Sequence, residues 1–121
     1  MVRILGIVGS PRVRGNTERV VAKALKAAED EGAETELVRL AGKEVKSCDA
    51  YLHCRKTGDC RIKDDFKPIF AGYLSGAKGR VFENKVGGAL VVARRTGQNF
   101  TFAQLLFFLL YQGMIVPGST N

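Results

Sequence analysis

Long apolar runs are missing from this sequence. Its longest one, Leu105 to Tyr111, is far shorter than the roughly 20 residues that a transmembrane helix needs. A secretory leader is missing as well, because Met1, Val2 and Arg3 are followed directly by an apolar segment with strand character. We therefore expect a cytoplasmic protein with no membrane partner, whose cysteines stay reduced rather than forming structural disulfides.

Signals for nucleic-acid binding are also scarce. The net charge is +7, but the basic residues are spread along the chain, and no basic helix or ladder of aromatic and basic residues occurs. A diffuse positive field favours small phosphorylated cofactors, so we expect no nucleic-acid partner. The 121 residues, of which 45% are hydrophobic and 26% charged, suit one globular domain.

A strand, a turn and a helix at the N-terminus form the most informative pattern that is present. The apolar segment Ile4–Val8 predicts a strand buried on both faces. The turn after it leads directly into a helix, whose first N–H groups and positive dipole end attract anions. Polar, basic and glycine residues gather in this turn, which suits a phosphate ligand: Gly9, Ser10, Arg12, Arg14, Gly15, Asn16 and Thr17.

Two common phosphate motifs are absent from this turn. A Walker loop has four residues between its glycines and then a lysine, whereas here five residues separate Gly9 from Gly15 and Asn16 replaces the lysine. The glycines also lack the spacing of the dinucleotide fingerprint G-x-G-x-x-G. The turn therefore predicts a cradle for a single phosphate group, against the alternative of an ordinary turn before a helix.

The rest of the chain alternates between helical and strand periodicity. In order, we predict a helix over 17–31, an edge strand over 34–40, the start of a helix over 65–70, a fully buried strand over 86–93, a helix over 99–112 and a short strand over 114–117. This order predicts an α/β fold with a parallel sheet, whose ligand lies at the carboxyl ends of the strands. We therefore expect Ser10–Thr17, Arg94–Gln98 and Pro117–Thr120 to converge.

Residues 41–64 are polar and contain all three cysteines, Cys48, Cys54 and Cys60. A zinc site that includes His53 is disfavoured, because His53 and Cys54 are adjacent and lack the usual spacing between ligands. We expect this single histidine to be solvated.

Three stretches of the chain resemble the iron–sulfur flavoproteins within the NADPH-dependent FMN reductase family, which are flavodoxin-like. They are GSPRVRGNTERV, SCDAYLHCRKTGDCRIKDDF and FENKVGGALVVARRTGQNFTFAQLLFFLLYQGMIVPGS, and the resemblance runs over nearly all of the chain. It implies one FMN-binding domain over residues 1–121, with a doubly wound parallel sheet and a cysteine-containing loop at 41–64.

The resemblance also implies where the cofactor binds. The first motif would hold the FMN phosphate through Ser10, Arg12, Gly15, Asn16 and Thr17. A second loop would lie against the flavin ring, formed by Ala93, Arg94, Arg95, Thr96, Gly97 and Gln98. The two arginines suit the anionic reduced flavin or the phosphates of NAD(P)H, with a solvated pair as the alternative. No catalytic acid or nucleophile is expected, because flavin N5 itself exchanges hydride.

The cysteines depart from the family pattern C-x2-C-x2-C-x4–7-C. Cys48, Cys54 and Cys60 match it, but Tyr51 stands at the position of the second cysteine. Three thiolates leave one iron of a four-iron cluster without a protein ligand. The segment is therefore compatible with a cluster that has an exchangeable fourth ligand, with a three-iron cluster or with no cluster.

The chain is also shorter than the family pattern. Roughly thirty residues are absent after Phe70, including the strand that would pair with Ile4–Val8 in the flavodoxin order 2-1-3-4-5. Their absence would leave central strand edges unpaired. We therefore expect an incomplete sheet and a break in the chain between Phe70 and Gly72; a true deletion would instead pair residues 86–93 directly with Ile4–Val8.

Three functions are compatible with these features. They are an electron-transfer flavoprotein that links a ferredoxin-like carrier to FMN through a cluster, an NAD(P)H-dependent flavin or quinone reductase without a cluster, and a non-enzymatic FMN-binding module. We favour an FMN-binding redox flavoprotein, either an NAD(P)H-dependent FMN reductase-like oxidoreductase or an iron–sulfur flavoprotein in electron transfer. The helix over 99–112 is apolar all round, with Phe107, Phe108 and Tyr111 beyond its core face, which predicts a homodimer or tetramer.

Overall fold

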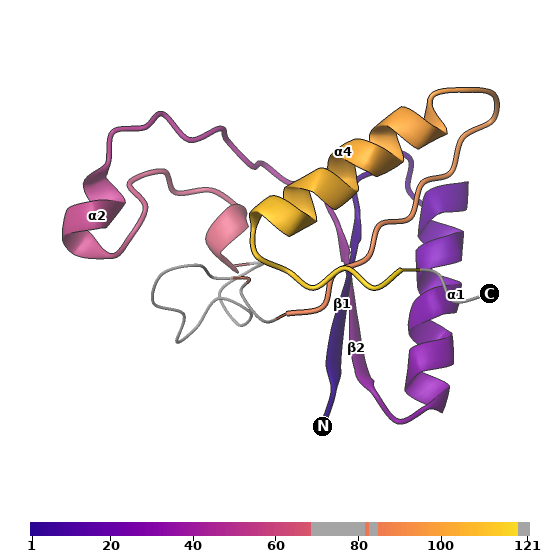
Figure 1. Ribbon diagram of the computed structural model, residues 1–121. Coiled ribbons are helices and arrows are strands. Elements are labelled where there is room, and N and C mark those ends of the chain that lie inside the picture. The colour runs from indigo at the N-terminus through magenta and orange to yellow at the C-terminus, as the bar shows by residue number, and fades with distance from the viewer. Residues whose placement is uncertain (69–81, 83–84, 119–121) are drawn as a thin grey trace.

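The protein is described here by a computed structural model that covers residues 1–68, 82 and 85–118. A parallel pair of strands, β1 and β2, lies at its centre and is connected by helix α1 (Figure 1). The pairing begins with Arg3 opposite Glu34 and ends with Val8 opposite Arg39. These elements form a βαβ unit, as the predicted parallel sheet requires, with β1 at Arg3–Val8, α1 at Asn16–Asp30 and β2 at Glu34–Arg39.

Helix α1 packs on the two strands through the face that its periodicity predicts. Leu25 is buried and Val21 and Ala28 are half-buried, whereas Ala24 is exposed. The helix approaches β1 most closely at Gly6, where an added Cβ would lie 2.8 Å from both Leu25 Cδ1 and Val21 Cγ1. Gly6 therefore sets how closely the helix and the strand pack.

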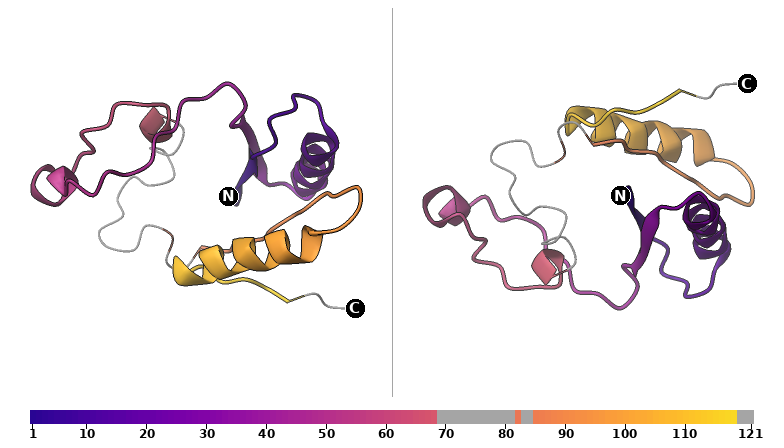
Figure 2. Two further views of the ribbon diagram at one scale, coloured as in Figure 1. Left: turned by 90° about the horizontal axis from the view of Figure 1, so that it is seen from above. Right: turned by 90° about the horizontal axis from the view of Figure 1, so that it is seen from below.

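The opposite face of β1 is open. Val8 is 1% exposed, but Ile7 is 44% exposed, so the prediction of a strand covered on both faces is wrong. The reason is that, among the elements the structure describes, α1 is the one that packs extensively on β1 and β2. Figure 2 shows α4, which spans Gln98–Tyr111, on a different side of the strands from α1.

Helix α4 confirms the helix predicted over 99–112, but the strands predicted on either side of it are wrong. Within the described residues, the segments 86–93 and 114–117 are joined by an isolated parallel bridge between Val86 and Ile115. Leu90 and Val92 are 38% and 40% exposed. These residues have strand composition but no neighbouring strand, because β1 pairs with β2 and with no other described segment.

The middle of the chain projects away from the βαβ unit and includes the short helix α2 at His53–Thr57 (Figures 1 and 2). The helix predicted to begin over 65–70 is present at Phe66–Pro68. Its continuation and the break predicted between Phe70 and Gly72 lie outside the described residues. None of the helices in the described part of the chain is long and apolar enough to span a membrane.

Candidate functional site

The turn from Gly9 to Thr17, which we name the cradle, connects the carboxyl end of β1 to the first turn of α1. Ligands of α/β folds bind at this end of a parallel sheet. Val8 anchors the start of the cradle, because its side chain is buried and its carbonyl accepts the Leu40 N–H at 3.0 Å. The sheet therefore fixes one end of the cradle and α1 fixes the other.

Gly15 precedes α1 and supplies no side chain to cap it. The Gly15 carbonyl accepts the Arg19 N–H at 3.1 Å, and no side-chain hydrogen bond caps the first turn. An added Cβ at Gly15 would lie 3.2 Å from both the Cβ and the carbonyl oxygen of Arg12. The tight path of the cradle thus favours glycine, and the first N–H groups of α1 remain available to an anion.

The five phosphate-binding residues predicted from the sequence all lie in this turn. Ser10 and Thr17 are half-buried, whereas Arg12 and Asn16 are exposed. Ser10 Oγ accepts the Arg12 N–H at 3.3 Å, which folds the turn back on itself. Within the described part of the chain, the Arg12 guanidinium forms no ion pair with a carboxylate. It is therefore available to a phosphate.

Glu18, which the sequence reasoning missed, is a charged residue of the first turn of α1 that holds the cradle in place. It is 6% exposed, and its Oε2 accepts the Arg14 N–H at 2.8 Å while its Oε1 accepts a hydrogen bond from Arg39 Nη2 at 2.7 Å. Arg14 has a φ of 58°, a left-handed conformation that is uncommon for residues other than glycine. An acidic residue three positions after Gly15, as in a capping box, is the sequence signal that could have indicated this role.

The pairing of Glu18 with Arg39 fixes the charge of both groups. The hydrogen bond from Arg39, supported by the Arg14 N–H, holds the pKa of Glu18 below its ordinary value. The same hydrogen bond raises the pKa of Arg39. Both side chains are therefore charged at neutral pH and cancel one another, which leaves the positive charges of Arg12 and Arg14 to act on a ligand.

The second loop predicted to bind the cofactor lies at the same end of the molecule as the cradle (Figure 1). Ala93, Arg94, Arg95 and Thr96 are exposed. Gly97 precedes α4 with a φ of 95°, and its carbonyl accepts the N–H and the hydroxyl of Thr101 at 3.1 and 3.2 Å. No hydrogen bond or ion pair among the described residues joins this loop to the cradle.

The expected convergence of the C-terminal segment with these loops is wrong for Pro117. Figure 2 shows the chain after α4 on the side of that helix that faces away from β1. Its one backbone pairing in the described residues is with the segment around Val86, since Gly87 N–H donates to the Ile115 carbonyl at 2.9 Å. Without a strand between β1 and Val86, nothing connects Pro117 to the cradle. Thr120 lies outside the described residues.

Polar contacts close the projecting segment 44–67, which we name the cysteine arm. At its base, Asp65 Oδ2 accepts the Glu44 N–H at 2.8 Å, and the Glu44 carbonyl accepts the Asp65 N–H at 2.9 Å. Asp64 Oδ2 accepts the Lys46 N–H at 2.7 Å, and this hydrogen bond lowers the pKa of Asp64. The two ends of the arm are therefore held together by carboxylates.

Further along the arm, Arg61 links two residues on the opposite side of the loop. Its guanidinium donates hydrogen bonds to Asp49 Oδ2, and this interaction lowers the pKa of Asp49. The same guanidinium lies 4.3 Å from the centre of the Tyr51 ring, in a cation–π contact. Tyr51, at the position where the sequence resemblance predicts a cysteine, thus takes part in closing the arm.

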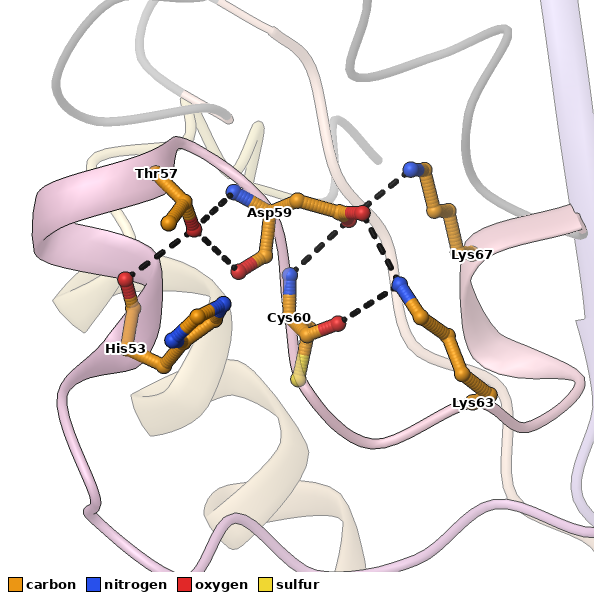
Figure 3. A network of polar contacts seen from close by, with 6 residues as sticks. All are labelled: His53, Thr57, Asp59, Cys60, Lys63 and Lys67. Carbon is orange, nitrogen blue, oxygen red and sulfur yellow. Dashed lines mark hydrogen bonds and ion pairs between the residues drawn. The ribbon is translucent and has the colours of Figure 1, made fainter.

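The tip of the arm is organised around Asp59 (Figure 3). Its carboxylate accepts hydrogen bonds from Lys63 at 2.9 Å, Lys67 at 2.8 Å and the Cys60 N–H at 2.9 Å. The two lysines, with Lys67 contributing most, hold the pKa of Asp59 well below its usual range. Thr57 Oγ1 donates to the His53 carbonyl and accepts the Asp59 N–H at 3.3 Å.

The three cysteines are exposed free thiols on this arm, and His53 is exposed as predicted. Within residues 1–68, 82 and 85–118, no three histidine, cysteine or acidic side chains come together as a metal centre requires. A cluster that bridges its ligands needs the thiolates to converge on one point. Within the part of the chain that the structure describes, Cys48, Cys54 and Cys60 are therefore not gathered around one point.

Comparisons with known proteins identify related chains. A family model described as NADPH-dependent FMN reductase matches residues 2–72. An iron–sulfur flavoprotein of Methanocaldococcus jannaschii is 34% identical over 150 aligned positions, which cover 99% of this chain and 78% of the relative. An iron–sulfur flavoprotein of Archaeoglobus fulgidus is 33% identical over 145 aligned positions, which cover 93% of this chain and 73% of the relative. No solved structure matches the chain.

The alignment with the Methanocaldococcus relative shows that this chain is shorter than the matched part of that protein. It spans 150 positions, whereas this chain has 121 residues, so at least 29 positions of the Methanocaldococcus relative have no counterpart here. The family match ends at residue 72, next to the predicted break after Phe70. Both observations agree with the expectation that residues of the family pattern are absent from this sequence.

Proposed function

Because the chain belongs to the NADPH-dependent FMN reductase family, whose fold is flavodoxin-like, we propose that it binds FMN in the cradle and acts as an oxidoreductase. The observation that carries the proposal is the first turn of α1, which follows Gly15 without a side-chain cap, next to a turn that carries an exposed Arg12. Helix termini of this kind bind one terminal phosphate well.

The residues of the cradle divide the binding of the phosphate between them. The N–H groups of the first turn of α1 would donate hydrogen bonds to the phosphate oxygens, together with the side chains of Asn16 and Thr17. Arg12 would add a charge-assisted contact, which is stronger than a neutral hydrogen bond. Ser10 holds the backbone of Arg12 and so maintains the path of the turn.

The loop from Ala93 to Gly97 would orient the flavin ring and receive NAD(P)H. When bound, FMN supplies the hydride and electron exchange. Arg94 and Arg95 are exposed. Their loop lies at the cradle end of the molecule, so their charges can attract the phosphates of a nicotinamide cofactor. The cytoplasmic location and the dependence on NAD(P)H remain predictions.

A second candidate function is electron transfer between a ferredoxin-like carrier and FMN through an iron–sulfur cluster. The three cysteines at family positions and the names of the relatives favour it. In the described residues the three thiols do not come together as one ligand group, and this observation and the Tyr51–Arg61 contact favour the reductase without a cluster. A module that binds FMN without turnover is the third candidate.

The absorbance spectrum of the anaerobically purified full chain separates these candidates. We expect flavin bands after reconstitution with FMN, and bleaching of these bands by NADPH. Flavin bands accompanied by the broad absorption of an iron–sulfur centre, with iron in the preparation, would favour electron transfer. Flavin bands without any response to NADPH would favour a binding module, and failure to retain or bind any flavin would contradict the proposal.

A further inference from the structure

We propose that Glu18 and Arg39 are positioning residues for the FMN phosphate: Glu18 holds the backbone of the cradle at Arg14, and Arg39 neutralises the Glu18 carboxylate beside the bound phosphate. The inference rests on the proposed FMN site. Neither residue belongs to the phosphate-binding set of the cradle, and each acts through another group. The pair joins β2, α1 and the cradle in one contact.

The geometry shows how one carboxylate fixes the cradle. Glu18 lies in the first turn of α1, and Arg39 is the last residue of β2. Each carboxylate oxygen has its own partner, with 2.8 Å to the Arg14 nitrogen and 2.7 Å to Arg39 Nη2. The bond to Arg14 stabilises a left-handed residue between Arg12 and Gly15. Loss of this acceptor would release the turn that presents Arg12 and the first N–H groups of α1.

The charge of Glu18 explains why Arg39 is needed. The N-terminal turn of a helix favours a carboxylate for the same reason that it favours a phosphate, since both interact with the positive end of the dipole. A buried carboxylate so close to the site would repel a phosphate dianion unless a cation compensates it. Arg39 supplies that cation, with its own side chain 46% exposed. Arg39 therefore contributes more to the binding of FMN than to the binding of a flavin without a phosphate.

The experiment compares FMN with riboflavin, which lacks the phosphate, in four variants of the full chain at neutral pH. They are Glu18→Ala, Glu18→Gln, Arg39→Met and the double variant Glu18→Gln/Arg39→Met. Quenching of flavin fluorescence gives both affinities, and far-UV circular dichroism checks folding. Lys26→Met serves as the matched control, because it removes the ion pairs of Lys26 with Glu29 and Asp30 in the last turns of α1.

We expect Glu18→Ala and Arg39→Met each to weaken FMN binding about tenfold, or about 1.4 kcal/mol, and to leave riboflavin binding unchanged. Glu18→Gln retains an acceptor oxygen for the Arg14 N–H, so its loss of FMN affinity should be smaller than that of Glu18→Ala. The double variant should bind FMN more tightly than Arg39→Met alone, because the uncompensated carboxylate is gone. Lys26→Met should bind both flavins as the wild type does.

The outcomes distinguish the positioning role of Glu18 and Arg39 from the FMN site itself. Equal losses for FMN and riboflavin, or no recovery in the double variant, would overturn the positioning role while the wild type still binds FMN. A wild type that binds neither flavin would overturn the FMN site itself. If Arg39→Met does not fold, the comparison of Glu18→Ala with Glu18→Gln tests the positioning role of Glu18. The same FMN affinity in both variants would contradict the role of the hydrogen bond to the Arg14 N–H.

Discussion

Arg12 is the residue on which the phosphate preference of the cradle depends most directly. Its side chain is exposed, and its guanidinium forms no ion pair with a carboxylate of the described chain. Its backbone is fixed by Ser10, and the neighbouring turn is fixed by Glu18. The cradle therefore presents one uncommitted cation on a constrained backbone, which is what a single charge-assisted contact requires.

Replacing Arg12 by alanine should weaken FMN binding by about 1.5–3 kcal/mol, the usual loss for one hydrogen bond to a charged group. Riboflavin binding should not change, because riboflavin has no phosphate for Arg12 to contact. Isothermal titration of both flavins measures the two effects. Arg55→Ala, at an exposed arginine on the cysteine arm, is the control. Equal losses for the two flavins would mean that Arg12 does not bind the phosphate.

At the scale of elements, β1 and α1 pack closely at Gly6 because this residue has no side chain. Leu25, one of the two buried apolar residues of the described chain, packs over this position. The small core makes this contact important, since little other apolar surface is removed from water here. The position of α1, and with it the cradle, depends on the size of residue 6.

Gly6→Ala should lower the free energy of unfolding by about 1–3 kcal/mol, because a methyl group would overlap Leu25 and Val21 and force them to move. Urea denaturation followed by circular dichroism measures the change. The control is Gly88→Ala, because an added Cβ at Gly88 has nothing within 4 Å. An unchanged denaturation midpoint for Gly6→Ala would show that α1 can shift without loss of packing.

At the scale of the whole molecule, α4 exposes several large apolar side chains. Phe100 is 70% exposed, Phe107 72% and Tyr111 77%, and their spacing places them along one side of the helix. Phe100, Ala103, Gln104 and Phe107 line a shallow hollow. Apolar patches of this kind mark surfaces that become buried on association.

We predict that the chain forms a homodimer or tetramer through α4. Light scattering after size-exclusion chromatography at micromolar concentration should give the mass of two or four subunits. Phe107→Glu should shift the protein toward the monomer, since a charge at the centre of the patch is costly to bury. Val45→Glu, at an exposed valine outside α4, should leave the mass of the assembly unchanged. A wild-type monomer under these conditions would contradict the prediction.

The sequence by itself determined the elements whose signals are local. The apolar run of β1, the periodic face of α1 and the apolar helix α4 were predicted within about one residue of their observed limits, because periodicity and turn residues act over a few neighbours. The residues of the cradle were predicted for the same reason, since they form one continuous turn between β1 and α1. The family followed from motifs of this local kind.

Only the tertiary structure decided the features that join distant residues. Glu18 and Arg39 are 21 positions apart, and no local pattern shows that the end of β2 brings them together. The same holds for Arg61 and Asp49, which close the cysteine arm, and for residues 86–93, whose strand composition was misleading. A strand needs a partner edge as well as a suitable sequence, and the presence of that edge depends on the rest of the sheet.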